Sequence, residues 1–242
     1  MKIIVFCCDW CAYPGADLAG ILRLEYPAEV RIIKVMCSGR VDPVLVLEAL
    51  KRGIDGVMVT GCHPGECHYL HGNIEAERRV ELLRYIFGYS GIDPRRVRVE
   101  WIAANEGEKF AHVTREFTRE IEEAGAITPD EMNAAKILQN VFSSERMRLV
   151  LGASRRAIEL EGVDREWYRG VMERTAREEV LREKILDELR KSGSLSAVEI
   201  AERIGEPPAD VFWNLIAMKR RGIVVDMGVV DRSMRFGIEE GA

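Results

Sequence analysis

The stretch KIIVFCCDWCAYPGADLAGILRLEY, residues 2–26, contains the first repeating unit of the fold. Residues 2–6 are a short continuous apolar run with β-branched side chains, which is typical of a parallel strand buried on both faces. In residues 15–26 large apolar side chains recur near helical spacing, at Leu18, Ile21, Leu22 and Tyr26. A buried strand followed by a helix is therefore expected here.

The same alternation continues as far as residue 125. Further strands are expected at 30–36, 56–61 and 96–104, and further helices at 42–53, 73–91 and 106–125. Four strand–helix units in succession predict right-handed βαβ connections and a parallel sheet with helices on both faces. The fold class is thus α/β, with a flavodoxin-like domain over residues 1–126. A strand order of 2-1-3-4 places the crevice that binds ligands between strands 1 and 3.

The pattern changes after this domain. Thr128, Pro129 and Glu131 form a helix start with a capping box and a proline in the first turn. Helical character then continues to about residue 175, with expected breaks near Gly152 and Gly162. Residues 127–176 are therefore expected to be a helical linker.

Residues 177–242 resemble a small winged-helix domain, with three short helices followed by a two-stranded hairpin over 223–238. Ser196 and Glu199 form a second capping box. The third helix carries Phe212 and Trp213, which are expected in its core. Within that helix the basic residues lie only at its end, at Lys219, Arg220 and Arg221, and the hairpin adds Arg232 and Arg235. This distribution favours a protein-docking module over a DNA-binding one.

Composition narrows the class of protein. The 242 residues are 47% hydrophobic and 31% charged, with a net charge of −5, as in ordinary soluble proteins. This charge disfavours a general nucleic-acid binder. No apolar run approaches the roughly 18 residues of a membrane span. The N-terminal apolar run is too short for a signal peptide, so a cytoplasmic protein is expected.

The cysteines are confined to the first part of the chain. All six precede residue 68: Cys7, Cys8, Cys11, Cys37, Cys62 and Cys67. A secreted disulfide scaffold would distribute its cysteines along a short chain. Clustering in a protein expected to be cytoplasmic favours a metal or redox site.

The cysteines follow three different strands of the predicted sheet. Cys7, Cys8 and Cys11 follow strand 1, Cys37 follows strand 2, and Cys62 and Cys67 follow strand 3. Because the carboxyl ends of parallel strands share one edge, the three loops are expected to meet there. Plant-type [2Fe–2S] proteins also use a C-x2-C and a C-x4-C step, but in the opposite order and on a different fold, so the analogy is only chemical. Thiolates also suit zinc. The first loop lacks Ser and Thr, which disfavours a flavin phosphate at that place.

Three motifs together carry a family resemblance: CCDWCAYPGADLAG, VMCSGRVDP and GVMVTGCHPGECHYLHGN. In this order and spacing they resemble the delta, or iron–sulfur, subunit of methyl-viologen-reducing hydrogenase, over residues 1 to about 130. The resemblance implies a [2Fe–2S] cluster and an electron relay. It implies transfer from a hydrogenase or a formate dehydrogenase to the flavoprotein subunit of heterodisulfide reductase. The C-terminal unit is not part of the family's core domain.

Residue assignments follow from this convergence and this resemblance. The expected metal ligands are Cys8, Cys11, Cys37, Cys62 and Cys67, which offer more thiolates than the four that a [2Fe–2S] cluster takes. Cys7 points to the other side of its strand from Cys8 and is expected to be a buried thiol.

The histidines of the third loop are expected to lie around the cluster. His63 and His68, with His71, are expected to donate N–H groups to its sulfurs or to cap the loop. Histidine ligation of the Rieske type is disfavoured because cysteines already suffice.

Three other side chains near the cysteines have expected roles. Asn73 is expected to cap the helix that follows its loop. Asp42 is expected to cap the helix that begins at Pro43, and the alternative is that Asp42 and Arg40 bond the cluster loop. Trp10 either shields the cluster from solvent or lies at a partner interface.

The leading function is an electron-transfer subunit without substrate chemistry of its own. The chain has no Ser-His-Asp set, phosphate loop or paired-carboxylate motif. The alternatives are an iron–sulfur redox-sensing transcription regulator with a winged helix, and a zinc-stabilised scaffold.

Overall fold

A computed structural model describes residues 1–238, and the chain divides into two units, Met1–Glu173 and Arg174–Ala242. Each unit has its own hydrophobic core. Among the helices of the described residues, none is long and apolar enough to cross a membrane.

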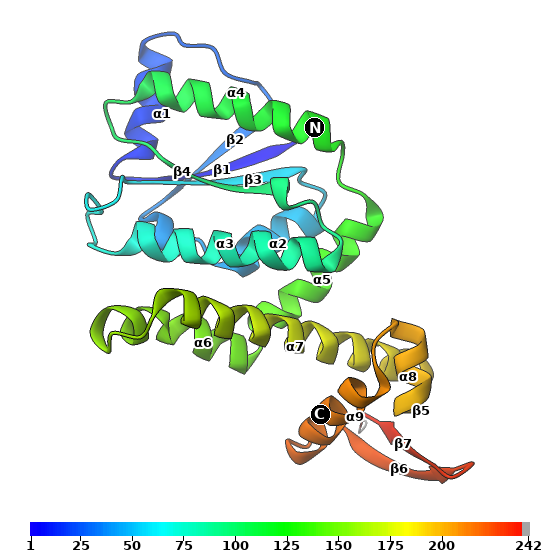
Figure 1. Cartoon of the computed structure of the whole chain (residues 1–242). Helices are drawn as coiled ribbons and strands as arrows, with labels where there is room; N and C mark the ends of the chain where they lie inside the picture. The colour runs from blue at the N-terminus through cyan, green and yellow to red at the C-terminus, as the bar shows by residue number, and fades with distance from the viewer. Residues whose placement is uncertain (239–242) are drawn as a thin grey trace. The chain divides into compact units, whose positions relative to one another are not determined.

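The first unit is built on a four-stranded parallel sheet with the order β2-β1-β3-β4. This order is the expected one. Helices α1 and α4 cover one face of the sheet, and α2 and α3 cover the other (Figure 1). The strands are β1 Ile3–Cys8, β2 Val30–Val35, β3 Gly56–Gly61 and β4 Val97–Trp101. The helices are α1 Ala12–Ile21, α2 Pro43–Lys51, α3 Gly72–Ser90 and α4 Gly107–Ala124.

The core of this unit lies between the sheet and its two helical layers. Every residue of β3 is buried, as a strand with neighbours on both edges requires. Aromatic and aliphatic side chains of the helices fill the layers above and below it. The largest fully buried ones include Leu47, Leu50, Leu83, Phe87, Phe110 and Phe117.

Helix α1 differs from its expected position. It begins at Ala12 and ends at Ile21, and its buried residues are Ala12, Gly15, Ala16 and Ala19. The larger Ile21 and Leu22, two of the side chains that recur near helical spacing, are 70% and 51% exposed. Small residues face inward because neighbouring backbone comes very close. A Cβ on Gly15 would lie 2.9 Å from the Ala103 carbonyl oxygen.

Helices α5 Pro129–Ser143 and α6 Glu145–Arg155 follow, and the expected capping box of Thr128 and Glu131 is present. The break expected near Gly152 is wrong, because Gly152 lies inside α6. The chain turns at Ser144 instead, whose hydroxyl accepts a hydrogen bond from the Met147 N–H at 3.3 Å. A π-helix, η3 Arg156–Leu160, continues α6. The break near Gly162 is confirmed, and α7 Arg165–Ser192 begins just after it.

The second unit contains the end of α7, two short helices and a three-stranded antiparallel sheet in the order β5-β7-β6. The hairpin and the capping box of Ser196 and Glu199 are confirmed. The third strand, β5, was not expected. The elements are β5 Ser194–Ser196, α8 Ala197–Ile204, α9 Pro208–Arg220, β6 Val225–Val230 and β7 Ser233–Gly237.

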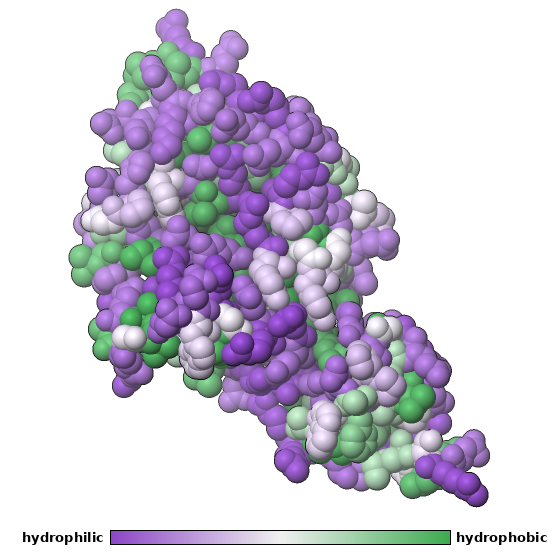
Figure 2. Space-filling model, viewed as in Figure 1, coloured by the Kyte–Doolittle hydropathy of each residue, from purple (hydrophilic) through white to green (hydrophobic). Residues whose placement is uncertain are grey.

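The inner face of α9 is formed by Val211, Leu215 and Met218, at helical spacing. The expectation that Phe212 and Trp213 are core residues is wrong. They lie on another face of the helix and are 41% and 67% exposed. In the view of Figure 2, hydrophobic residues come to the surface of this unit, whereas hydrophilic ones cover most of the visible first unit.

Two of the basic side chains in this unit are engaged within it. Lys219 forms an ion pair with Asp226. Arg235 bonds Glu199 at 3.2 Å and donates to the Ser194 carbonyl oxygen at 2.8 Å. These contacts stabilise the small sheet and its helix, which reduces the charge available for phosphate binding.

A buried ion pair joins Arg96, the last residue of the 3₁₀-helix η2 Pro94–Arg96 that precedes β4, to α5 in the first unit. The Arg96 guanidinium donates from Nε to Glu131 Oε1 at 2.6 Å and from Nη2 to Oε2 at 2.8 Å. Burial alone raises the pKa of Glu131, but hydrogen bonds from Arg96 and from the Thr128 and Asp93 N–H groups lower it to about 2. The folded protein therefore favours the ionised carboxylate.

The Arg96–Glu131 ion pair is expected to make the free energy of unfolding depend on pH. Because the folded pKa lies below the ordinary value of 4.5, this stabilisation is full above about pH 4.5 and is lost as the pH falls towards 2. In Glu131→Gln, the free energy of unfolding measured by urea denaturation is expected to depend less on pH between about 2 and 4.5. The substitution is also expected to lower the free energy of unfolding at pH 7 by about 3–5 kcal/mol, because Arg96 stays buried without its partner charge. Asp130→Asn, at an exposed neighbour, is the control, and an equal loss in that variant would contradict the assignment.

Candidate metal centre

Three loops meet at the carboxyl edge of the parallel sheet. The loop after β1 leads to α1, the loop after β2 leads to a 3₁₀-helix, η1 Ser38–Arg40, and the loop after β3 leads to α3. The register pairs Cys8 with Val35 and Cys7 with Thr60. The three strands therefore end level with one another, and the residues that follow them are neighbours.

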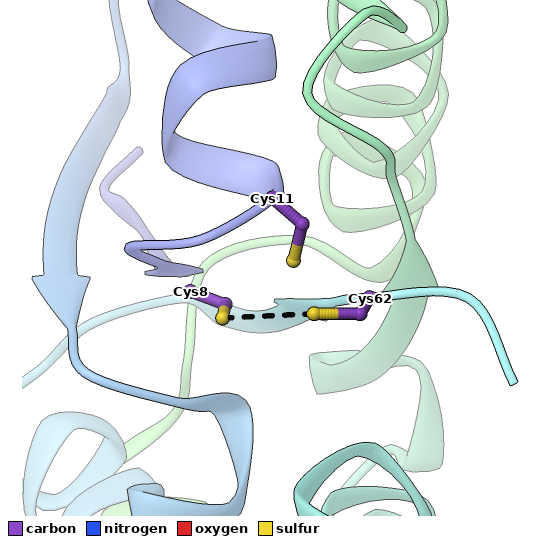
Figure 3. A group of neighbouring side chains, drawn as sticks. All are labelled: Cys8, Cys11 and Cys62. Atoms are coloured by element: carbon purple, nitrogen blue, oxygen red, sulfur yellow. Dashed lines mark hydrogen bonds between the residues drawn. The ribbon is translucent and has the colours of Figure 1, made fainter. Parts of the chain in front are cut away.

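The sulfurs of five cysteines lie in two adjacent groups. Cys8, Cys11 and Cys62 form the first, with all three sulfurs within 4.8 Å of one another and 3.9 Å between Cys8 and Cys62 (Figure 3). Cys37 and Cys67 form the second, with 3.9 Å between their sulfurs. All five side chains are buried. We call these five residues the five-thiol cluster. The three loops therefore meet at one edge of the sheet, as the sequence predicts.

Cys7 lies apart from the five-thiol cluster. It is fully buried in the sheet, and burial raises the pKa of its thiol to about 12 although a hydrogen bond with Thr60 opposes the shift. Such a thiol is a small apolar core residue in chemical terms.

Glycines allow the loops to approach one another. A Cβ on Gly72 would lie 2.1 Å from the Cys37 sulfur and 3.4 Å from the Cys67 sulfur. A Cβ on Gly39 would lie 2.8 Å from the Gly72 Cα. A side chain at Gly72 would occupy the space that the Cys37 thiol takes, and one at Gly39 would collide with the backbone of Gly72.

Backbone N–H groups surround the sulfurs. The pKa of Cys8 is lowered to about 6, first by a hydrogen bond from the Cys11 thiol and also by the N–H groups of Trp10 and Ser38, although burial opposes this. Burial raises the pKa of Cys37 to about 11 against a hydrogen bond from the Gly39 N–H. The loops thus supply donors to sulfur anions, which is the environment that reactive and metal-binding thiolates need.

Other thiols of the cluster resist ionisation. The hydrogen bond that Cys11 gives to Cys8, together with burial, raises the Cys11 pKa. Burial also raises the pKa of Cys62, against a hydrogen bond with Cys11. Several sulfur anions at this spacing therefore require a cation between them.

The arrangement fits a thiolate-bound metal. A tetrahedral metal with metal–sulfur bonds of about 2.3 Å holds its sulfurs about 3.8 Å apart, close to the two 3.9 Å separations. Soft sulfur donors with no carboxylate among them select zinc or iron–sulfur centres. The Ser38 hydroxyl, buried beside Cys37, has no hydrogen-bond partner among the described residues. A buried donor without a partner is rare and indicates an acceptor that the protein alone does not provide.

The histidines of the third loop occupy different places. His63 Nε2 is paired with Glu106 Oε2 at 2.7 Å. His68 is exposed and stacks on Trp10 with a centroid separation of 3.7 Å, and its backbone N–H bonds the Cys62 thiol. Trp10 is 49% exposed and its Nε1 donates to the Tyr69 hydroxyl at 3.3 Å.

The expected caps have opposite outcomes. Asp42 caps α2 as expected, accepting from the Val44 N–H at 3.0 Å. Asn73 does not cap α3, because the helix begins one residue earlier, at Gly72. Its amide instead donates to the carbonyl oxygens of Cys62 and His63, at 3.1 and 2.8 Å. Asn73 therefore holds the β3 loop in place, a role that a capping pattern does not reveal.

Gly72→Ala tests the close approach at the second thiol group. The added methyl is expected to displace the Cys37 sulfur and to lower the free energy of unfolding of the metal-free protein by about 1–3 kcal/mol. Alkylation of Cys37, followed by mass spectrometry, is expected to become faster. Gly88→Ala in the same helix is the matched control, since its Cβ would meet only Pro94 at 3.7 Å. Equal stabilities of the two variants would contradict this packing.

Comparison with known proteins adds a family match. A family model described as methyl-viologen-reducing hydrogenase, delta subunit, matches residues 3–125. The iron-sulfur subunit of the F420-non-reducing hydrogenase vhc from Methanococcus voltae is 49% identical over 136 residues, which are 56% of this chain and 94% of the relative. The iron-sulfur subunit of the F420-non-reducing hydrogenase from Archaeoglobus profundus is 50% identical over 124 residues, 51% of this chain and 90% of the relative.

A longer relative contains the same domain. One of the subunits of the ferredoxin/F(420)H(2)-dependent CoB-CoM heterodisulfide reductase from Methanosarcina acetivorans is 50% identical over 125 residues, or 52% of this chain. The matched part is only 16% of that longer protein. The family match includes all three cysteine loops and ends before α5.

Proposed function

Because the chain belongs to the family of the delta subunit of methyl-viologen-reducing hydrogenase, we propose that it is an electron-transfer subunit whose five-thiol cluster holds an iron–sulfur centre. The observation that carries the proposal is the convergence of five buried thiols from three loops. An iron–sulfur centre supplies one-electron transfer at a fixed potential. The residues of the three loops bind, bury and hydrogen-bond it.

We propose a [2Fe–2S] centre as its type. Two thiol pairs are present, Cys8 with Cys62 and Cys37 with Cys67. In each pair the sulfur–sulfur distance matches that of two thiolates bound to one tetrahedral metal. Four thiolates on two irons are the ligands of such a centre. Cys11 is the fifth thiol, close enough to Cys8 and Cys62 to replace either.

We propose that His63 and His68 act on the centre through the loop that carries them. The His68 N–H favours the Cys62 thiolate. The His68 ring packs on Trp10, next to the first thiol group in the chain. His63 ties its loop to Glu106, whose carboxylate also accepts from the Ala103 N–H at 2.8 Å. Hydrogen bonds around metal ligands of this kind tune the potential of the metal.

The proposed partners follow from the relatives. We propose that electrons arrive from a hydrogenase or formate dehydrogenase and leave to the flavoprotein subunit of heterodisulfide reductase. The occurrence of a 50% identical domain within a longer heterodisulfide reductase protein supports that acceptor, because a fused domain keeps its partner adjacent. The six cysteines are all free, which suits a reducing compartment, and we place the protein in the cytoplasm.

The family match favours this function over the redox-sensing regulator. For the second unit we propose a winged-helix-like module that docks on protein. The ion pairs of Lys219 and Arg235, together with the exposed Phe212 and Trp213, support this role over DNA binding.

The metal content tests the proposed function directly. The full chain, purified without oxygen, is expected to contain about two irons and two acid-labile sulfides, with a visible spectrum that dithionite bleaches. The measurement is elemental analysis with sulfide determination and absorption spectroscopy. Zinc without iron, or a spectrum that dithionite does not change, would contradict an electron-transfer role.

Cysteine variants test the ligand assignment. Serine at Cys37 or Cys67 is expected to abolish or strongly reduce the iron content, because each supplies a thiolate that has no substitute nearby. Cys8→Ser, Cys11→Ser and Cys62→Ser are each expected to keep more iron than those two variants, because the two remaining thiols of the first group can still supply two ligands. Cys7→Ala is the matched control and is expected to keep the iron, because its thiol lies in the sheet. Loss of iron from Cys7→Ala alone would overturn the assignment.

A further inference from the structure

A segment outside the matched family region packs beside the five-thiol cluster. This segment, residues 145–160, comprises α6 and the π-helix η3, whereas the family match ends at residue 125. Both elements lie in the first unit, like the thiols. We call residues 145–160 the latch.

The latch reaches the start of α3 through Glu159. One carboxylate oxygen of Glu159 lies 3.4 Å from His71 Nδ1, and the other accepts from Arg78 Nη2 at 3.1 Å. Arg78 also donates from Nη1 to Glu75 at 2.8 Å, and the Ser154 hydroxyl contacts Glu75 at 3.4 Å. Two latch residues thus hold three residues of the helix start.

Burial makes this network costly to break. Arg78 is only 6% exposed, and its Nε has no hydrogen-bond partner among the described residues. The two carboxylates of Glu75 and Glu159 therefore provide the neutralising charge for this buried guanidinium. Removal of one partner from a buried ion pair is strongly destabilising because the remaining charge stays desolvated.

The helix start that the latch holds is also the wall of the second thiol group. His71 lies four residues after Cys67 and directly precedes Gly72, the residue packed closest to the Cys37 sulfur. A cavity of about 480 Å³ is lined in common by Cys37, His71, Gly72, Glu75 and Arg155. The ionic network and the thiols are therefore neighbours around one cavity, and a shift of the first would move the second.

The conformation of the latch also supports a functional role for Glu159. Glu159 lies in a five-residue π-helix, Arg156–Leu160. Such turns are rare and recur at functional sites. The wider turn changes the direction of the side chains that follow an α-helix, and here it accompanies the contacts of Glu159 with both His71 and Arg78.

We propose that Glu159 is a positioning residue for the iron–sulfur centre and sets its reduction potential. Through His71 and Arg78 it fixes the start of α3, and hence Gly72, against Cys37 and Cys67. Its negative charge belongs to the ionic network next to the cavity that Cys37 lines, and it disfavours the reduced state, which carries one electron more. The inference rests on the proposed function, because it concerns the potential of the proposed centre. It assigns a redox role to a segment beyond the matched family region.

The test compares two carboxylates at and just after the latch in the full chain. Glu159→Gln keeps the size and a hydrogen-bonding oxygen but removes the charge. At an applied potential equal to the wild-type midpoint, the ratio of reduced to oxidised centre is expected to rise several-fold, and a tenfold rise corresponds to 59 mV. The measurement is a redox titration followed by absorption and electron paramagnetic resonance. Glu161→Gln is the matched control, because Glu161 is exposed and pairs with exposed Arg156.

The outcomes separate this inference from the proposed function. Wild-type iron content with an unchanged potential in Glu159→Gln would overturn the role of Glu159 and leave the proposed function standing. If that variant does not hold iron, Glu159→Asp decides. Iron at the wild-type potential in the aspartate variant supports the role of the charge, and loss of iron there as well overturns it. Absence of iron from the wild-type protein would overturn the proposed function itself.

Discussion

Parallel pairing of β1 with both β2 and β3 is the constraint on which the five-thiol cluster depends. The register places the carboxyl ends of the three strands side by side, so that thiols far apart in the sequence become neighbours without any long-range loop. Short loops then suffice, because each strand end already points at the same place. A register shift of one residue in either pairing would exchange the faces to which Cys7 and Cys8 point. Cys8 would then leave the other thiols, and Cys7 would take its place.

The second requirement is electrostatic. Several buried thiolates within about 4 Å of one another repel, and burial disfavours each anion further. Backbone N–H groups of the loops oppose this effect. The donors are Trp10, Ser38, Gly39 and His68, and their hydrogen bonds lower the pKa values of the thiols, which burial raises. These donors reduce the repulsion but do not remove it. The five-thiol cluster is therefore a site in which a bound cation would provide the remaining charge compensation.

The same domain is used with different additions. It makes up nearly all of the hydrogenase iron-sulfur subunits that match it and a small part of a heterodisulfide reductase protein. Here it is followed by helices whose acidic and basic side chains reach the start of α3, and by a second unit with its own core. Additions of this kind change the surroundings of a centre without changing its ligands, and they are a simple physical route to a different potential or partner.

The sequence by itself determined the repeating strand–helix pattern and the three loops that carry cysteine, because hydrophobic period and right-handed crossover leave few alternatives. It also determined the capping boxes at Thr128 and Ser196, which are local patterns. Only the tertiary structure decided the buried face of α1, the exposure of Trp213, the role of Asn73 and the grouping of the thiols into three and two. These features depend on distances between segments that are remote in the chain. No local pattern of residues encodes how closely Gly72 approaches Cys37, or that Glu159 lies beside His71.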